Sequence, residues 1–234
     1  GSFQMNTKLY INGEFLDSGV KEKIIDPSTQ EVITQVAVAS EKDVGLALES
    51  SRLAFDEGAW PKISLNERKG FLLKIAQGIL DKAGDLAELE TRNTGKPIKE
   101  STFMDIPSSA KTFEYFAQHL QEYLKEESLE LEGARSSLVR QPQGVAVLIV
   151  PWNYPLLIAS WKMAQALGAG NTVILKPSSL TPLTDIALAE VIHEAGLPKG
   201  SVNIINASGK DVGKLLCQDR RADMISFTGS NEVG

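Results

Sequence analysis

The sequence is poor in the features that mark membrane-spanning and nucleic-acid-binding proteins. Its 234 residues contain no run of about twenty uninterrupted apolar residues, so no transmembrane helix is predicted. The formal net charge is −6 at pH 7, whereas proteins that bind nucleic acid need a surplus of Lys and Arg to displace counterions from phosphates. We therefore expect no membrane partner and no nucleic-acid partner.

Cysteine and histidine are also scarce. A single cysteine, Cys217, excludes an internal disulfide, and its apolar helical context (LLC) predicts a buried packing residue rather than a nucleophile. The two histidines, His119 and His193, lie in helix patterns without ligand spacing to a Cys or carboxylate, so we expect packing or surface roles and no metal. No secretory leader pattern is found around Met5, which favours a cytoplasmic location.

The chain opens with β-strand patterns. Asn12-Gly13 lies between two short apolar-polar segments of residues 8–15 and is a strong hairpin signal. A second strand pair is expected around residues 26–29, which have the composition of a turn. These strands are expected to form an edge layer.

The pattern then changes to amphipathic helices. Ser40 and Ser64 are each followed three residues later by an acidic residue, as in a capping box, and each precedes a helical apolar face. A further helix is expected to carry Leu86 and to stop at Gly95. Pro107 is expected in the first turn of the next helix, where proline lacks only a donor that would be unpaired.

Residues 128–142 return to a strand-like alternation around Gly133. Such a hairpin has no neighbouring strand in sequence to join, and an unpaired strand edge can pair with another chain. One interpretation is an oligomerisation arm; the other is a surface hairpin packed on its own domain.

From residue 143 onward, apolar runs alternate with helix patterns, which is typical of a parallel sheet covered by helices on both faces. The expected fold class is thus α/β with a Rossmann-like sheet. The strands are expected at 145–150, 172–175, 202–205 and 224–227, and the helices at 156–167, 183–195 and 211–217.

Asn153 follows the first of these strands and precedes Pro155, which suits a helix start. Its side-chain oxygen could cap the helix while its NH₂ group stays free, and a free donor beside a helix N-terminus suits a developing oxyanion. Ordinary capping is the alternative. Trp152 could form the wall of a planar ligand site or be buried in the core.

Lys176 ends the second strand, where a lysine can reach ribose hydroxyls or phosphate in the crevice of a doubly wound sheet. A solvated lysine is the alternative. Ser178, Ser179 and Thr181 add hydroxyl groups but no carboxylate. Residues 227–234 run from a strand into Gly229 and Ser230, which could present backbone N–H groups to a phosphate or could form a plain turn.

Taken together, the blocks PWNYPLL, WKMAQALGAGNTVILKPS, EAGLPKGSVNII and ISFTGSNEVG resemble the aldehyde dehydrogenase superfamily, in that order and spacing. The resemblance runs from about Leu9 to the end and implies oxidation of an aldehyde to a carboxylic acid with NAD or NADP. In the family's mechanism a cysteine thiolate attacks the aldehyde, hydride passes to nicotinamide, and water activated by a glutamate hydrolyses the thioester.

The family's motif roles carry over residue by residue. Asn153 is implied as the catalytic amide donor to the substrate oxygen, and Lys176 as the ligand of the adenosine ribose. Tyr154, Leu157 and Trp161 are candidate substrate linings. The other implied cofactor-binding residues are Pro151, Trp152, Ser178, Ser179, Gly209, Gly213, Phe227, Thr228, Gly229, Ser230 and Val233.

The chain departs from the family pattern at three places. Ser179 stands where the family often has a glutamate, and losing that carboxylate removes repulsion against a 2′-phosphate, so NADP is expected to be tolerated or favoured. Asn206-Ala207 replaces a usual Pro-Gly, which leaves the local loop geometry open. The family's glutamate base and cysteine nucleophile come after the point that matches Gly234, and Cys217 is not expected to replace that nucleophile.

These observations predict three parts: residues 5–127 as the β and helical start of the cofactor-binding domain, 128–142 as the arm, and 143–234 as an incomplete Rossmann-like core without a catalytic domain. The parent protein is expected to be an NAD(P)-dependent oxidoreductase that forms a homo-oligomer, a dimer or tetramer. The chain alone is expected to be an inactive truncated fragment. The rival interpretations are a non-catalytic binding or assembly fragment and another doubly wound nucleotide enzyme.

Overall fold

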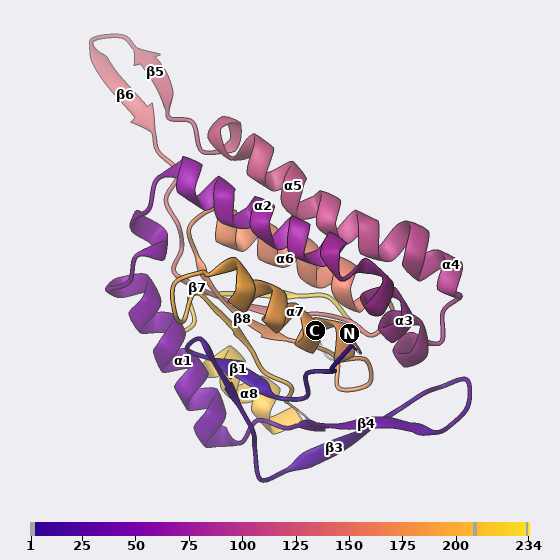
Figure 1. The fold of residues 1–234 in the computed structure, drawn as a ribbon. Coiled ribbons are helices and arrows are strands. Elements are labelled where there is room, and N and C mark those ends of the chain that lie inside the picture. Colours follow the sequence, from indigo (N-terminus) through magenta and orange to yellow (C-terminus); the bar gives the residue numbers. More distant parts are fainter. Residues whose placement is uncertain (1–2, 208–209, 233) are drawn as a thin grey trace.

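The computed structural model describes residues 3–207, 210–232 and 234 (Figure 1). In chain order its elements are β1 (Leu9–Ile11), β2 (Glu14–Leu16), β3 (Lys21–Ile25), β4 (Val32–Ala37), α1 (Glu41–Asp56), the 3₁₀-helix η1 (Trp60–Lys62), α2 (Leu65–Asp81), α3 (Ala83–Thr94), α4 (Ile98–Glu100), the π-helix η2 (Ser101–Asp105), α5 (Ile106–Tyr123), β5 (Glu127–Leu131), β6 (Ala134–Leu138), β7 (Val145–Ile149), α6 (Pro155–Gly168), β8 (Thr172–Lys176), α7 (Leu183–Ala195), β9 (Val202–Ile204), α8 (Lys210–Gln218) and β10 (Met224–Phe227).

A central sheet in the order β10-β7-β8-β9-β1-β2 organises the molecule. The four strands from the second half of the chain, β10, β7, β8 and β9, run parallel, as the sequence predicts. Helices α2, α5, α6 and α7 pack on one face, and α1 and α8 on the other (Figure 1). The expectation of a parallel sheet covered on both faces is confirmed.

Alternate residues of the central strands belong to two different cores. Along β7, Val145 and Val147 pack with α1 and α8, whereas Ala146 and Leu148 pack with the larger layer of helices. All four side chains are buried. A strand with both faces covered needs apolar residues at consecutive positions, which explains the continuous apolar run at the start of this strand.

The two amino-terminal hairpins form where the turn chemistry predicts them. Asn12 (φ 52°) and Gly13 (φ 73°) both have the positive φ that a two-residue hairpin requires. The β1–β2 hairpin extends the central sheet, because Tyr10 pairs antiparallel with Ile204 of β9. Strands β3 and β4 form a separate two-stranded sheet. The expected edge layer is confirmed for the first hairpin.

The helices of the first half also start and stop at the expected signals. Ser40 and Ser64 each accept from the backbone of the acidic residue three positions on, so that both α1 and α2 begin with a capping box. Helix α3 ends at Gly95, which adopts a left-handed conformation with φ 82°.

The expectation that Pro107 lies in the first turn of a helix is confirmed, because α5 begins at Ile106 and Pro107 is its second residue. Helix α5 follows directly on a helical segment that begins at Ile98 and passes through η2. Proline cannot donate to the preceding turn, and its ring would clash with a carbonyl there. The wide π-helical turn just before it, in which the Ile106 N–H bonds to the carbonyl of Ser101, accommodates that proline.

Strands β5 and β6 form a hairpin around Gly133 (φ 80°), in register from Glu127 with Leu138 to Leu131 with Ala134. It projects away from the body of the molecule (Figure 1). The side chains of β5 are exposed throughout, with Leu131 at 60%. The alternative of a hairpin packed on its own domain does not match this arrangement.

Candidate functional site

Three segments that are far apart in sequence meet at one edge of the sheet. Ile149, the last residue of β7, lies opposite Lys176 of β8 and opposite Phe227 of β10. The polar segments that follow these three strands therefore begin side by side. Because doubly wound folds bind ligands outside the carboxyl ends of their parallel strands, this edge is the candidate site.

The turn after β7, residues 151–156, is held through its backbone, and we call it the anchored turn. Thr181 Oγ1 donates to the carbonyl oxygen of Trp152 over 3.1 Å. Lys96 Nζ donates to the carbonyl oxygen of Asn153 over 2.9 Å. Two successive carbonyl groups are thus fixed by side chains from other parts of the chain.

Asn153 does not cap helix α6 in the usual way. The helix begins at Pro155, and its N-cap residue is Tyr154, which makes no side-chain cap. Asn153 Oδ1 instead accepts from the adjacent Tyr154 N–H at 3.1 Å. Within the described residues its Nδ2 donates no hydrogen bond, so this exposed amide is available to a ligand at the positive end of the helix.

Two tryptophans of this region lie at the surface. Trp152 is 58% exposed, so the alternative of a buried core tryptophan is wrong. Trp161, a candidate substrate lining, is 56% exposed and borders a cleft of about 410 Å³ between α6 and β10. Lys162 lines the same cleft and donates to Ser226 Oγ over 2.5 Å, and burial lowers the pKa of its ammonium. Among the other candidate linings, Tyr154 and Leu157 are partly buried.

Lys176 is partly buried at the end of β8, so the alternative of a freely solvated lysine is wrong. Burial lowers the pKa of its ammonium, while the nearby Cys217 and Glu22 oppose that shift. Its Nζ has one long contact among the described residues, 3.5 Å to the carbonyl oxygen of Pro177, and so retains donors for a ligand. Ser178 and Ser179 lie beside it and are partly buried.

The segment after β10, residues 228–232, is held much less firmly, and we call it the open segment. The Thr228 N–H bonds to the carbonyl of Ile149, which ties its first residue to β7 at 3.1 Å. Gly229 and Ser230 are exposed. A Cβ at Gly229 would lie 2.7 Å from the ring of Phe227 and would force this ring to shift, so glycine allows the close approach.

The remaining sequence-predicted cofactor residues are not all placed. Gly209 and Val233 lie outside the described residues. Gly213 is on α8, and Pro151 begins the anchored turn; both are partly buried. The loop with Asn206-Ala207 in place of the usual Pro-Gly is tied to the segment that follows β4, because the Asn206 carbonyl accepts from Ala39 N at 2.8 Å.

A buried pair of acids lies behind the anchored turn. Glu90 of α3 accepts from Leu156 N at 3.4 Å, which occupies one free N–H of α6, and from Thr184 Oγ1 at 3.2 Å. Burial raises the pKa of Glu90 to about 7. Asp185 is fully buried, and burial together with the Glu90 carboxyl raises its pKa well above the ordinary value. Neither oxygen of Asp185 has a partner among the described residues.

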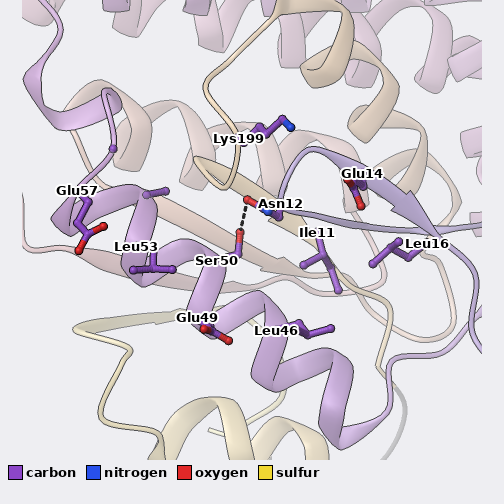
Figure 2. A pocket seen from close by; sticks show the side chains of 12 residues that line it. Ile11, Asn12, Glu14, Leu16, Leu46, Glu49, Ser50, Leu53, Glu57 and Lys199 are labelled. Atoms are coloured by element: carbon purple, nitrogen blue, oxygen red, sulfur yellow. Dashed lines mark hydrogen bonds between the residues drawn. The ribbon is translucent and has the colours of Figure 1, made fainter.

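A cavity of about 510 Å³ lies elsewhere (Figure 2). It is bordered by the β1–β2 turn, α1 and Lys199, and Ser50 Oγ bonds to Asn12 Oδ1 within it at 3.3 Å. Lys199 precedes β9, so this cavity lies where the parallel strands begin, whereas Asn153 and Lys176 lie where they end. It contains none of the predicted site residues.

Cys217 is exposed on α8, so the expectation of a buried cysteine is wrong. The histidines have the expected roles: His193 contacts the hydroxyl of Tyr10 at 3.3 Å, and His119 stacks on Tyr115. In the described ranges no three His, Cys, Asp or Glu side chains gather as a metal site. No helix of that part of the chain has both the length and the apolarity to cross a bilayer.

The residues that hold the anchored turn were not predicted from the sequence. Lys96, its partner Asp105, and Glu90 are charged residues in or next to helices, where charge is usually solvated. The side chains of Lys96 and Asp105 are only 10% and 1% exposed. No local pattern distinguishes them from surface residues, since their partners are distant in sequence.

Comparison with known proteins agrees with this arrangement. The profile described as "Aldehyde dehydrogenase family" matches residues 16–234. The chain belongs to the aldehyde dehydrogenase family. This family member is 38% identical over 235 residues to the NADP/NAD-dependent aldehyde dehydrogenase PuuC of Escherichia coli, a match that covers 100% of the chain and 48% of that relative.

Other relatives give the same result. The betaine aldehyde dehydrogenase of Bacillus subtilis is 42% identical over 98% of the chain and 47% of its own length. The crystal structure of betaine aldehyde dehydrogenase from Staphylococcus aureus in complex with NAD⁺ superimposes with a TM-score of 0.94 at 37% identity, over 98% of this chain and 46% of that one. The chain thus spans about half the length of the curated relatives it matches.

Proposed function

We propose that the whole natural protein oxidises an aldehyde to a carboxylic acid with NAD⁺ or NADP⁺. The observation that carries this proposal is the meeting of three family segments at one sheet edge, with the free amide of Asn153 at the positive end of α6. Family membership supports the same reaction, and the relatives' names mention both cofactors.

The chain's own residues fit a dinucleotide. Lys176 has unused donors in a partly buried position, which suits the hydroxyls of a ribose. The exposed backbone of Gly229 and Ser230 suits a pyrophosphate. The exposed face of Trp152 suits a planar ring. When bound, the cofactor supplies the hydride acceptor.

Asn153 then has one chemical task in the reaction. Its Nδ2 donates a hydrogen bond to the aldehyde oxygen as that oxygen gains negative charge. The positive end of α6 stabilises the same charge, and both groups are held in place before the reaction begins. This is the catalytic role that we assign to the described residues.

The test is a steady-state assay of the whole natural protein with aliphatic, aromatic and amino aldehydes and with each cofactor. We expect reduction of the nicotinamide and formation of the acid with at least one aldehyde class. Cofactor binding without turnover across the panel would instead favour the rival, a non-catalytic binding or assembly protein. The cytoplasmic location stays a prediction that cell fractionation can check.

The absence of a carboxylate at Ser179 supports use of NADP. A carboxylate there would repel the 2′-phosphate, whereas the serine hydroxyl can donate to it. We expect the dissociation constant for NADP⁺ to be similar to or lower than that for NAD⁺, as measured by titration calorimetry. A strong preference for NAD⁺ would exclude this assignment.

We also propose that the β5–β6 hairpin mediates homo-oligomer formation. It projects from the body with unpaired strand edges and exposed Leu129, Leu131 and Leu138. Such an edge can add to a strand of another copy. Changing the three leucines to serine should lower the oligomeric state in sedimentation experiments, and an unchanged state would contradict the proposal.

A further inference from the structure

We infer that Lys96 is a positioning residue that aims the side-chain amide of Asn153. This inference rests on the proposed function, because it assigns Asn153 a role in the reaction. It adds a residue that lies outside the sequence blocks that carry the family resemblance, 57 positions before Asn153 in the chain.

The first argument is where the lysine side chain goes. Lys96 follows the helix-ending Gly95, and its side chain is only 10% exposed. Its ammonium lies 2.9 Å from the carbonyl oxygen of Asn153 and 4.2 Å from the centre of the Tyr154 ring. It thus contacts two successive residues of the anchored turn, through a hydrogen bond and a cation–π interaction.

The second argument is the geometry that results at Asn153. The carbonyl group of Asn153 is fixed by Lys96, and its Oδ1 is fixed by the N–H of Tyr154. With both the backbone and the side-chain oxygen held, the remaining Nδ2 has a defined direction. Without the hydrogen bond from Lys96, the peptide unit between Asn153 and Tyr154 can rotate. The side-chain amide of Asn153 then no longer has a fixed orientation.

The third argument concerns charge. Asp105, which is 1% exposed, pairs with Lys96, and its Oδ1 has no partner among the described residues. Buried ion pairs are weak sources of stability because desolvation offsets their attraction. An incompletely bonded buried pair beside Asn153 is therefore better explained by the placement of the ammonium than by a contribution to folding.

The test measures kcat and KM of Lys96→Met in the whole natural protein. We expect kcat to fall about 10- to 100-fold, the size of effect expected from a small misplacement of a reacting group. KM should change by less than about threefold, because binding is not the affected step. Lys82→Met, which removes a lysine that pairs with Glu190 and Glu194 on the surface, is the matched control and should keep wild-type kcat.

A conservative variant and a double variant separate positioning from folding. Lys96→Arg keeps the charge and a donor and should retain more kcat than Lys96→Met. Adding Lys96→Met to Asn153→Ala should cost less than about twofold more, since the residue being positioned is already gone. If Lys96→Met does not fold, Lys96→Gln, which keeps a polar group but is too short to reach, repeats the measurements.

Hydrogen exchange distinguishes a failure of this inference from a failure of the proposed function. In Lys96→Met we expect exchange at the amides of Tyr154 and Leu156 to be about tenfold faster than in the wild type. A wild type that turns over no aldehyde would refute the proposed function, and the exchange result would still decide whether Lys96 holds the turn. Unchanged exchange, a normal kcat in Lys96→Met or additive losses in the double variant would each overturn the inference.

Discussion

The anchored turn and the open segment follow neighbouring parallel strands and both border the candidate site, but they are held very differently. The backbone of the anchored turn accepts hydrogen bonds from Thr181 and Lys96 and donates one to Glu90, and these three residues come from three places in the chain. The open segment is tied to the sheet at Thr228, while Gly229 and Ser230 are exposed.

The difference matches the work that we propose for each segment. A donor that stabilises developing charge is effective when it is oriented before the reaction, which requires fixed neighbours. A phosphate contact made by backbone N–H groups requires instead a small residue and close approach, which Gly229 supplies. A segment whose backbone is fixed by many hydrogen bonds is suited to orient a side chain. A segment with an exposed backbone is suited to bind a ligand through its N–H groups.

The largest effect is expected from the side chain at the centre of the anchored turn. Asn153→Ala should lower kcat of the whole natural protein about 10²- to 10³-fold, or about 3–4 kcal/mol, because it removes one oxyanion donor. Steady-state kinetics measure this, with thermal unfolding as the check that the fold is kept. A loss in KM alone would mean that Asn153 binds substrate without stabilising charge.

The next effect concerns the acid behind the anchored turn. Burial raises the pKa of Glu90 from 4.5 to about 7. Below pH 4.5 both the folded and the unfolded protein hold this proton; as the pH rises to about 7 the unfolded chain loses it first, so stability decreases across this window. The expected decrease is about 3 kcal/mol, and Asp185, whose pKa is also raised, adds to it in the same direction.

Urea unfolding at a series of pH values between 4.5 and 7 tests this prediction. Glu90→Gln should remove the share of the stability decrease that comes from Glu90, because a neutral amide does not titrate. Glu194→Gln, at a surface ion pair, is the control and should leave the pH dependence unchanged. If the free energy of unfolding decreased equally with pH in the wild type and in Glu90→Gln, groups other than Glu90 would cause the decrease.

A smaller effect is expected from a single hydroxyl of the anchored turn. Thr181→Val keeps the shape of the side chain but removes the donor to the Trp152 carbonyl, and should lower the free energy of unfolding by about 1–2 kcal/mol. Thr228→Val in the exposed start of the open segment is the matched control, and should change it by less than about 0.5 kcal/mol. If both variants lost the same free energy of unfolding, the two segments would be held equally firmly and the contrast between them would be wrong.

Most of the fold could be predicted because its signals are local. The strand at residues 224–227 and the helix at 183–195 have the predicted bounds, since an apolar run between turn residues defines each of them. Pro107 marks the first turn of α5, as predicted. The π-helical turn before it shows the limit of such signals, because the segment that forms this turn packs on α3 through the bond between Thr91 and Ser101.

The site could be predicted less completely, for two physical reasons. Neighbouring helix positions point about 100° apart, so the apolar context of Cys217 did not reveal that Leu216 faces the core while Cys217 is exposed. The bond from Lys96 to Asn153 depends on how α3 packs near α6. That is a long-range property, and no pattern within residues 90–96 indicates it.

The smallest effect is expected at Ser230 of the open segment. Its side chain is exposed, so Ser230→Ala should change the free energy of unfolding by less than about 0.5 kcal/mol. If the Ser230 hydroxyl donates to a pyrophosphate beside the backbone N–H groups, its removal should weaken cofactor binding by about one hydrogen bond, roughly fivefold to tenfold. Titration calorimetry and urea unfolding of the same variant measure the two quantities. A stability loss above about 1 kcal/mol would show that the segment is held as firmly as the anchored turn, and the contrast between the two would then have to be abandoned.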